Sequence, residues 1–252
     1  MSPEIESLTI GGVRVDPRTM EVAIEDMLER ATSGRSSGIH FVNAYSVALA
    51  DRDASFAAAL RSSDMNLVDG APIALLARMA GMRSVRTPGP DFFSSMLRAN
   101  QDGRVRHFFI GGSEELLDSL RVGIAELAPR ASVVGTHAPP FRHLSGEEEA
   151  AIITTAVAAD ANILWVGLGT PKQDLFIERH KDTFPGPMLG VGAAFAFLAG
   201  SVPRAHPVLR RFGLEWLFRL ATEPRRLWRR YVLGNTRFLW VLLRGNTRQR
   251  QP

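Results

Sequence analysis

The chain has 252 residues, of which 45% are hydrophobic and 22% are charged, and its formal net charge is +4. This length and hydrophobic content can bury a large core and exclude disorder as the main state, while the absence of cysteine excludes disulfides, thiolate metal sites and a cysteine nucleophile. Residues 1–7 contain acidic side chains and no apolar run approaches ~18 residues, so we expect no secretory signal, no membrane span and a cytoplasmic location.

The first half of the chain alternates helical and strand patterns. Asp16 and Pro17 can cap and open a helix that reaches about residue 32, because apolar side chains recur there at helical spacing. The alternation continues with an expected strand at 39–42, a helix at 46–60, a strand at 66–68 and a helix at 71–79.

The second half repeats this alternation. Ser113 can cap a helix whose leucines share one face, and Ser145 with Glu148 forms a capping box for a helix to about residue 158. Pro171 suits the first turn of a helix over 172–180. Strands are expected at 107–110, 132–134, 162–166 and 188–191. These successive βα units predict an α/β fold with a mainly parallel sheet and helices on both faces.

Positive charge is concentrated in residues 203–252. This segment has twelve arginines, no lysine and two glutamates, which gives a net charge of +10, whereas residues 1–202 carry −6. Aromatic and leucine side chains are interspersed with the arginines, as in an amphipathic helix that lies on anionic lipid. The alternatives are a helix packed on the core with solvated arginines and a nucleic-acid patch. We expect a core domain at 1–202 and a basic, membrane-associating appendage at 203–252.

Polar residues and glycines follow the expected strands, at the sheet edge where parallel α/β folds bind ligands. These residues are Asn43, Asp69, Gly111, Gly112, Gly192 and Ala193. Asp69 could act there as a general base, or it could cap the helix that begins near Ala71. Arg86 lies in a proline-rich loop, where its guanidinium could hold a diphosphate through two parallel hydrogen bonds.

The loop at 167–173 is the most informative of these. Gly167 and Gly169 allow the backbone to approach a ligand closely, and the amide groups at the start of the following helix attract phosphate. Lys172 adds a positive charge. Alternatively, the glycines only relieve crowding in a strand-to-helix turn.

Two other patterns are interpreted as structural, and a third argues against one class of function. The run Asp51–Arg52–Asp53 matches the Asp-x-Asp pattern of metal-dependent sugar-nucleotide transferases, but it falls inside the expected helix 46–60. Neither His40 nor His107 has a partner at metal-ligand spacing. Gly167 and Gly169 are followed by Lys172 and not by the third glycine of a nicotinamide-binding fingerprint, which argues against an oxidoreductase.

Seven blocks in order resemble the WecG/TagA/CpsF glycosyltransferases, glycosyltransferase family 26. They are FVNA at 41–44, LVDG at 67–70, RTPGPD at 86–91, FIGG at 109–112, VGLGTPKQ at 166–173, GVGAAF at 190–195 and GLEWLFRL at 213–220. The ordered set covers almost the entire chain and is far more specific than any one block.

The resemblance implies a Rossmann-like, inverting transferase that moves a sugar from a UDP donor to a polyprenyl-diphosphate-linked saccharide, without a metal or other cofactor. It implies that Asp69 is the base, that Asn43, Arg86 and Gln173 contact substrate, and that the tail meets the leaving diphosphate. With the loops above, the expected substrate site comprises Asn43, Arg86, Gly111, Gly112, Gly169, Thr170, Lys172, Gln173, Gly192 and Ala193. The expected diphosphate contacts are Arg219, Arg225, Arg226 and Arg229.

Three departures from the family pattern leave the donor sugar open between N-acetylmannosamine, glucose and a related hexose. Phe41 replaces a threonine, Ala196 replaces an aspartate, and His206 is inserted between an alanine and a proline. The resemblance also implies a peripheral position on the inner face of the bacterial plasma membrane and allows a homo-oligomer. We expect no nucleic-acid partner. The alternative functions are a nicotinamide-dependent oxidoreductase and a non-catalytic basic lipid-binding module.

Overall fold

The computed structural model describes residues 7–82, 86–100, 102–211, 213–245 and 247–250. The chain divides into two compact units, each built from separate stretches of sequence. Unit 1 contains Met1–Thr19, Phe41–Pro88 and Pro203–Pro252, and unit 2 contains Met20–His40 and Gly89–Val202. The basic segment that was predicted as an appendage therefore packs with two earlier stretches of the chain in unit 1.

The larger sheet of the described chain has the strand order β4-β3-β8-β7-β5-β6. Its strands are β3 (Ser37–Val42), β4 (Met65–Val68), β5 (Arg106–Ile110), β6 (Ser132–His137), β7 (Ile163–Val166) and β8 (Pro187–Gly190). The pairs β3–β8, β8–β7, β7–β5 and β5–β6 are parallel. The predicted α/β fold with a mainly parallel sheet is confirmed.

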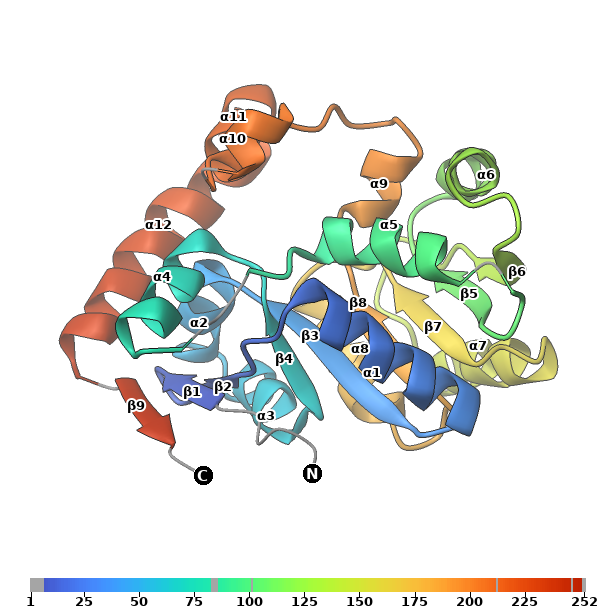
Figure 1. Ribbon diagram of the computed structural model, residues 1–252, viewed down its shortest axis with the longest axis horizontal. Helices are drawn as coiled ribbons and strands as arrows, with labels where there is room; N and C mark the ends of the chain where they lie inside the picture. Colours follow the sequence, from blue (N-terminus) through green and yellow to red (C-terminus); the bar gives the residue numbers. More distant parts are fainter. Residues whose placement is uncertain (1–6, 83–85, 101, 212, 246, 251–252) are drawn as a thin grey trace. The chain divides into compact units, whose positions relative to one another are not determined.

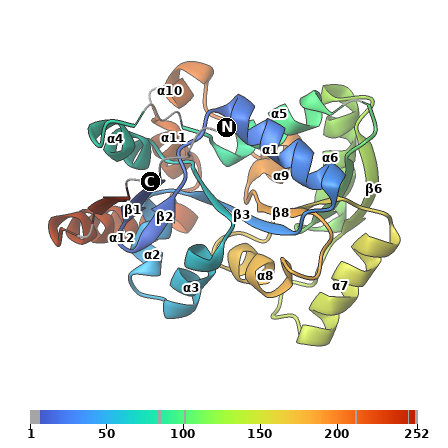
Figure 2. The same ribbon diagram turned by 60° about the horizontal axis from the view of Figure 1, so that its bottom comes forward.

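Unit 2 is a layered α/β structure. Its helices are α1 (Met20–Ser33), α5 (Gly89–Ala99), α6 (Glu114–Leu127), α7 (Gly146–Ala158), α8 (Lys172–His180) and α9 (Ala194–Leu198). Helices α1, α5, α6 and α9 lie on one face of the strands, and α7 and α8 lie on the other (Figures 1 and 2). Helices α6 and α7 begin at their predicted caps, because Ser113 accepts a hydrogen bond from the Leu116 amide and Ser145 shares a capping box with Glu148.

Each face of unit 2 buries its own apolar layer. On the α7 and α8 face, Phe108, Leu164 and Phe176 belong to one buried cluster. On the other face, the Phe93 ring packs edge-on against Trp165, with ring centroids 4.9 Å apart. Such rings bury large apolar areas and fix the strands against the helices. The loops at the carboxyl ends of these strands therefore start from rigid positions.

Unit 1 combines a small antiparallel sheet with six helices of the described residues. The sheet has the order β2-β1-β9, formed by β1 (Ser7–Ile10), β2 (Val13–Val15) and β9 (Thr247–Arg250). The helices are α2 (Ala44–Ala50), α3 (Ala54–Ser62), α4 (Ala71–Met79), α10 (Pro207–Arg211), α11 (Glu215–Thr222) and α12 (Pro224–Leu243). Strands β1, β2 and β9 were not predicted, because each is short and because β9 pairs with β1 from the other end of the chain.

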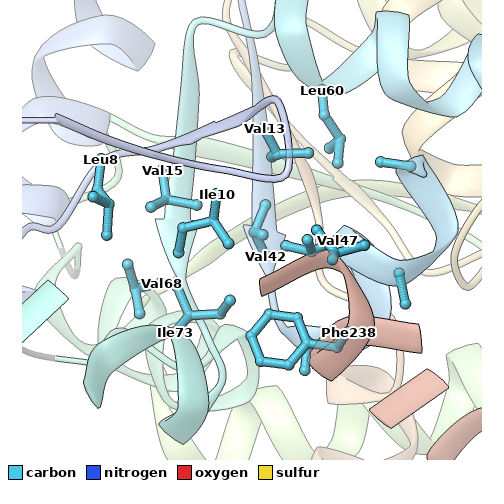
Figure 3. Close-up of a cluster of buried hydrophobic side chains, with 14 of the residues drawn as sticks. Leu8, Ile10, Val13, Val15, Val42, Val47, Leu60, Val68, Ile73 and Phe238 are labelled. Atoms are coloured by element: carbon cyan, nitrogen blue, oxygen red, sulfur yellow. The ribbon is translucent and has the colours of Figure 1, made fainter. Parts of the chain in front are cut away.

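One buried cluster joins the three stretches of unit 1. Figure 3 shows Ile10 and Val15 of the small sheet, Ile73 of α4 and Phe238 of α12 gathered in this cluster. Helix α12 also packs along α2, where Gly234 lies so close to Tyr45 that an added Cβ would come within 3.0 Å of its ring. The predicted alternative of a tail helix packed on the core thus describes one face of α12. Its other face exposes Trp228, Val232 and Leu239.

Two predicted helix boundaries are wrong. Helix α1 begins at Met20 and not at Asp16, because Asp16 is buried and its carboxylate accepts a hydrogen bond from the Asn66 amide at 2.8 Å. The predicted helix 46–60 is two helices, α2 and α3, since the Asp53 carboxylate caps α3 by accepting from the Ser55 and Phe56 amides. The Asp-x-Asp run thus lies between helices and serves as a cap.

None of the helices in the described ranges is both long and apolar enough to cross a lipid bilayer.

Candidate functional site

In unit 1, Asn43 and Asp69 follow the ends of β3 and β4 and contact each other. The Asn43 side-chain oxygen caps α2 by accepting from the Tyr45 and Ser46 amides at 3.1 and 3.3 Å. Its side-chain nitrogen is thereby directed toward Asp69 and donates to the carboxylate oxygen Oδ2 at 3.3 Å. A single asparagine thus uses both ends of its amide, one to start a helix and one to orient a carboxylate.

Asp69 is not the cap of α4. Gly70 occupies the N-cap position, and no side chain makes a capping hydrogen bond there. A Cβ on Gly70 would lie 3.0 Å from the Asn43 Cβ, so a glycine at this position lets the two loops approach. The half-buried Asp69 carboxylate precedes a helix N-terminus, where the helix dipole favours negative charge. The N-cap position of α4 therefore belongs to Gly70, and Asp69 lies one residue before it.

Arg86 lies beside the same strand end in unit 1. The amide of the neighbouring Thr87 donates to the Val68 carbonyl at 2.6 Å, and the buried Thr87 hydroxyl donates to the Arg18 carbonyl at 2.8 Å. The Arg86 guanidinium nitrogen Nη2 donates to the carbonyl of Arg210 at 2.8 Å. Arg86 therefore connects the end of β4 to the C-terminal segment.

The tail arginines differ in their surroundings. In α11, Arg219 is half-buried and lies 3.9 Å from the Glu223 carboxylate. In the first turn of α12, Arg225 is exposed. Arg226 and Arg229 also belong to α12, but their side chains lie outside what the structure describes.

In unit 2, the predicted glycine loops touch through their backbones. Gly111 has a φ of +129°, and a Cβ there would lie 2.7 Å from the carbonyl of Gly167. The Gly167 amide donates in turn to the Ile110 carbonyl at 2.7 Å. Gly112 also has a positive φ, of +78°. The glycines at 111 and 167 thus permit a loop contact that no other residue type could make without displacement.

Gln173 joins two more of these loops. Its side chain is buried, and its Oε1 accepts from the Gly169 amide at 3.1 Å and from the Gly192 amide at 3.0 Å. The amides of Gly169 and Gly192 therefore both bind this side chain in the structure. Thr170 and Ala193 are partly exposed next to these two glycines, and Lys172 is exposed in the first turn of α8.

A buried pair next to Gln173 was missed by the sequence reasoning. The His40 nitrogen Nδ1 lies 2.8 Å from the carboxylate of Asp174, and both side chains are almost fully buried. The only signal in the sequence was a histidine within an apolar strand. His107 is structural as predicted: Trp165 donates to its Nδ1 at 3.0 Å, and burial lowers the pKa of His107 to about 3.

The two units hold different chemical groups. Unit 1 holds a carboxylate oriented by an amide, together with a guanidinium, which are the groups that proton transfer and diphosphate binding require. Unit 2 holds glycine loops fixed at close range by Gln173. Among the described residues, no three carboxylate or imidazole side chains gather in a group that could hold a metal ion.

Comparison with known proteins identifies one family along nearly the whole chain. The model of the "Glycosyl transferase WecG/TagA/CpsF family" matches residues 8–252. A relative from Bacillus spizizenii is 27% identical over 199 residues, which cover 78% of this chain and 75% of the relative. A relative from Bacillus subtilis is 27% identical over 187 residues, which cover 73% of this chain and 70% of the relative. Both are named N-acetylglucosaminyldiphosphoundecaprenol N-acetyl-beta-D-mannosaminyltransferase.

Proposed function

Because the chain belongs to the WecG/TagA/CpsF family of glycosyltransferases, we propose that it transfers a sugar from a UDP-sugar to a polyprenyl-diphosphate-linked saccharide for a bacterial cell-surface polymer. The names of the two Bacillus relatives support the acceptor class, since both act on a diphosphoundecaprenol-linked sugar. The donor sugar is N-acetylmannosamine, glucose or a related hexose. Family membership sets aside the oxidoreductase alternative.

The contact between Asn43 and Asp69 is the observation that carries this proposal. A metal-free inverting transferase needs one group that accepts the proton of the attacking hydroxyl. Asp69 stands at the carboxyl end of β4, one residue before the N-cap of α4, and receives a hydrogen bond from Asn43 that orients its carboxylate. Asp69 is the base in the proposed reaction, and Asn43 positions it.

The reaction is a single displacement. Asp69 takes the proton of the acceptor hydroxyl as its oxygen bonds to the anomeric carbon, and the bond from that carbon to the diphosphate oxygen of UDP breaks with inversion. The departing UDP gains negative charge, which Arg219, Arg225, Arg226 and Arg229 offset in place of a metal ion. Lys172 and the loops fixed by Gln173 hold the donor.

The basic tail is proposed to place the enzyme on the inner face of the plasma membrane. Helix α12 buries Leu227, Phe238 and Val241 in unit 1 and exposes Trp228 and Leu239. Arginines along the same helix attract anionic headgroups, while exposed aromatic and leucine side chains suit the lipid interface. The helix thereby links acceptor-bearing lipid to the unit that contains Asp69.

The experiment is a kinetic comparison of Asp69→Asn with Asp118→Asn, an exposed aspartate of α6 that serves as the matched control. Transfer from UDP-sugars to a lipid-linked saccharide is measured by mass spectrometry, and UDP affinity is measured by calorimetry. We expect Asp69→Asn to lower kcat at least about a thousandfold, while UDP affinity stays within about twofold, because the base acts only during transfer. Added EDTA should leave wild-type activity unchanged.

Full activity of Asp69→Asn would remove Asp69 from the base role. Loss of activity in EDTA that Mg²⁺ restores would remove the metal-free mechanism. No transfer from any UDP-sugar by wild-type protein that still binds anionic vesicles would favour the non-catalytic lipid-binding module.

A further inference from the structure

Helix α4 has a buried face and an exposed apolar stripe. Ile73, Ala74 and Ala77 are buried in unit 1, and Figure 3 shows Ile73 directed into the apolar cluster. Leu75 and Met79 are 57% and 76% exposed. With Ala71 they recur every four residues, so the three side chains form one row along the helix, here called the α4 stripe. Large apolar side chains on a short surface helix suggest a ligand or partner.

The α4 stripe begins beside the charged groups of unit 1. The helix starts two residues after Asp69, and a Cβ on Gly213 would lie 2.5 Å from the Ala71 Cβ and 3.4 Å from the Arg86 Nη1. Ala71 and the Arg86 guanidinium are therefore both next to Gly213. From the start of α4 onward, the Asp69 carboxylate comes first and the Arg86 guanidinium follows beside Ala71. The exposed side chains of Leu75 and Met79 come last.

This order matches the order of groups in a polyprenyl-diphosphate-linked sugar. Such an acceptor presents a hydroxyl to the base, then its sugar ring, a diphosphate and a hydrocarbon chain. At a rise of about 1.5 Å per residue, Leu75 and Met79 lie about 8 and 13 Å along the helix from Gly70. A hexose and a diphosphate joined end to end extend on the order of 10 Å at ordinary covalent bond lengths. The hydrocarbon would therefore begin near Leu75.

We propose that the α4 stripe binds the first isoprene units of the acceptor's polyprenyl chain, with the acceptor diphosphate against Arg86. The proposal rests on the proposed function and adds the place where the lipid of the acceptor lies. A second copy of the chain fits this row less well, because a stable protein interface buries about 800 Å² per partner and the stripe offers two exposed side chains. A single hydrocarbon chain needs only such a narrow row.

The first experiment compares the double variant L75S/M79S with the matched surface variant V122S/F141S, whose side chains are 60% and 88% exposed in unit 2. Each is assayed with the same saccharide diphosphate bearing either a long polyprenyl chain or a methyl group. We expect L75S/M79S to raise KM about tenfold for the polyprenyl acceptor only, with kcat unchanged, since two apolar contacts are lost. The control variant should match wild type with both acceptors.

Three results would overturn the proposal. The first is an equal change, or no change, in KM for the two acceptors. The second is an equal loss of binding to anionic vesicles without polyprenyl lipid, which would make the stripe a general membrane contact. The third is conversion of a dimer to a monomer by L75S/M79S in sedimentation, which would assign the stripe to a second copy of the chain.

A crosslinking experiment tests the stripe when transfer itself fails. A photoreactive benzophenone amino acid is introduced at Met79 or at the control position Val122, and the protein is illuminated with vesicles containing a polyprenyl diphosphate without sugar. Crosslinking from position 79 and not from 122 supports the stripe even if no sugar is transferred, in which case only the proposed reaction is wrong. Absence of the crosslink at position 79 in an active enzyme contradicts the stripe alone.

Discussion

The candidate residues of unit 1 and unit 2 are held in place in opposite ways. In unit 2 the loops meet through main-chain atoms, with Gly111 against Gly167 and a buried Gln173 holding Gly169 and Gly192. In unit 1 the side chains of the partly exposed Asp69 and Arg86 form hydrogen bonds with Asn43 and with the Arg210 carbonyl. Main-chain contacts thus hold the predicted donor loops together, whereas side-chain hydrogen bonds hold the residues predicted for proton transfer.

This contrast predicts that the largest effect on stability comes from the backbone contact of unit 2. Gly111→Ala would place a Cβ 2.7 Å from the Gly167 carbonyl at a φ of +129°. We expect a loss of about 3 kcal/mol or more, because both the steric clash and the backbone conformation oppose alanine. Chemical denaturation measures the loss. Gly146→Ala is the control, since nothing lies within 4 Å of its added Cβ.

The side-chain link in the same unit should matter slightly less. Gln173→Met keeps the side-chain volume but leaves the Gly169 and Gly192 amides without their acceptor, which costs about 1–3 kcal/mol of stability. If the loops hold the donor, KM for the UDP-sugar should rise about tenfold with a smaller change in kcat. Lys172→Met on the exposed side of the same turn controls for stability. Unchanged stability in Gln173→Met would show that the loops do not depend on this link.

Lowering the pH should reduce the stability of unit 2, which contains His107. Burial lowers the pKa of His107 from 6.5 to about 3. Between these pH values the His107 imidazole binds a proton in the unfolded chain but stays neutral in the folded chain. Stability therefore falls as pH drops from about 6.5 to about 3, by about 1.4 kcal/mol per pH unit at most, or about 2 kcal/mol at pH 5. Hydrogen exchange at pH 7 and pH 5 should show the loss in β5 and β7. The His107→Gln variant should lack this component of the pH dependence.

Local patterns predicted the parallel strands and the capped helices because those signals lie within a few residues. Ser113 and Ser145 cap their helices as expected, and α4 and α8 have their predicted bounds. Strand β9 escaped prediction because it pairs with β1 from the other end of the chain. The helix expected to start at Asp16 was misplaced because Asp16 binds Asn66, a partner fifty positions away.

The same distinction between local signals and long-range contacts applies to the candidate site. Asp69 and the glycine loops were suggested by residues that follow strands, whereas Arg86 and the tail arginines gained their roles mainly from the family resemblance. Neither the local sequence patterns nor the family resemblance could show that Gln173 binds two loop amides or that His40 contacts Asp174. These contacts depend on how strands and helices pack. The sequence suggested the candidate residues, and only the fold gives the hydrogen bonds between them.

The smallest expected effect on stability separates the two functions of Asn43. Asn43→Ala removes the cap of α2 and the donor to Asp69, whereas Asn43→Ser keeps an oxygen that can cap the helix but cannot reach the carboxylate. We expect Asn43→Ala to cost about 1 kcal/mol and Asn43→Ser to cost only a few tenths. If Asn43 orients the base, both variants should lower kcat by about tenfold, so activity and stability would diverge in the serine variant. A serine variant with wild-type kcat would mean that Asp69 needs no help from Asn43.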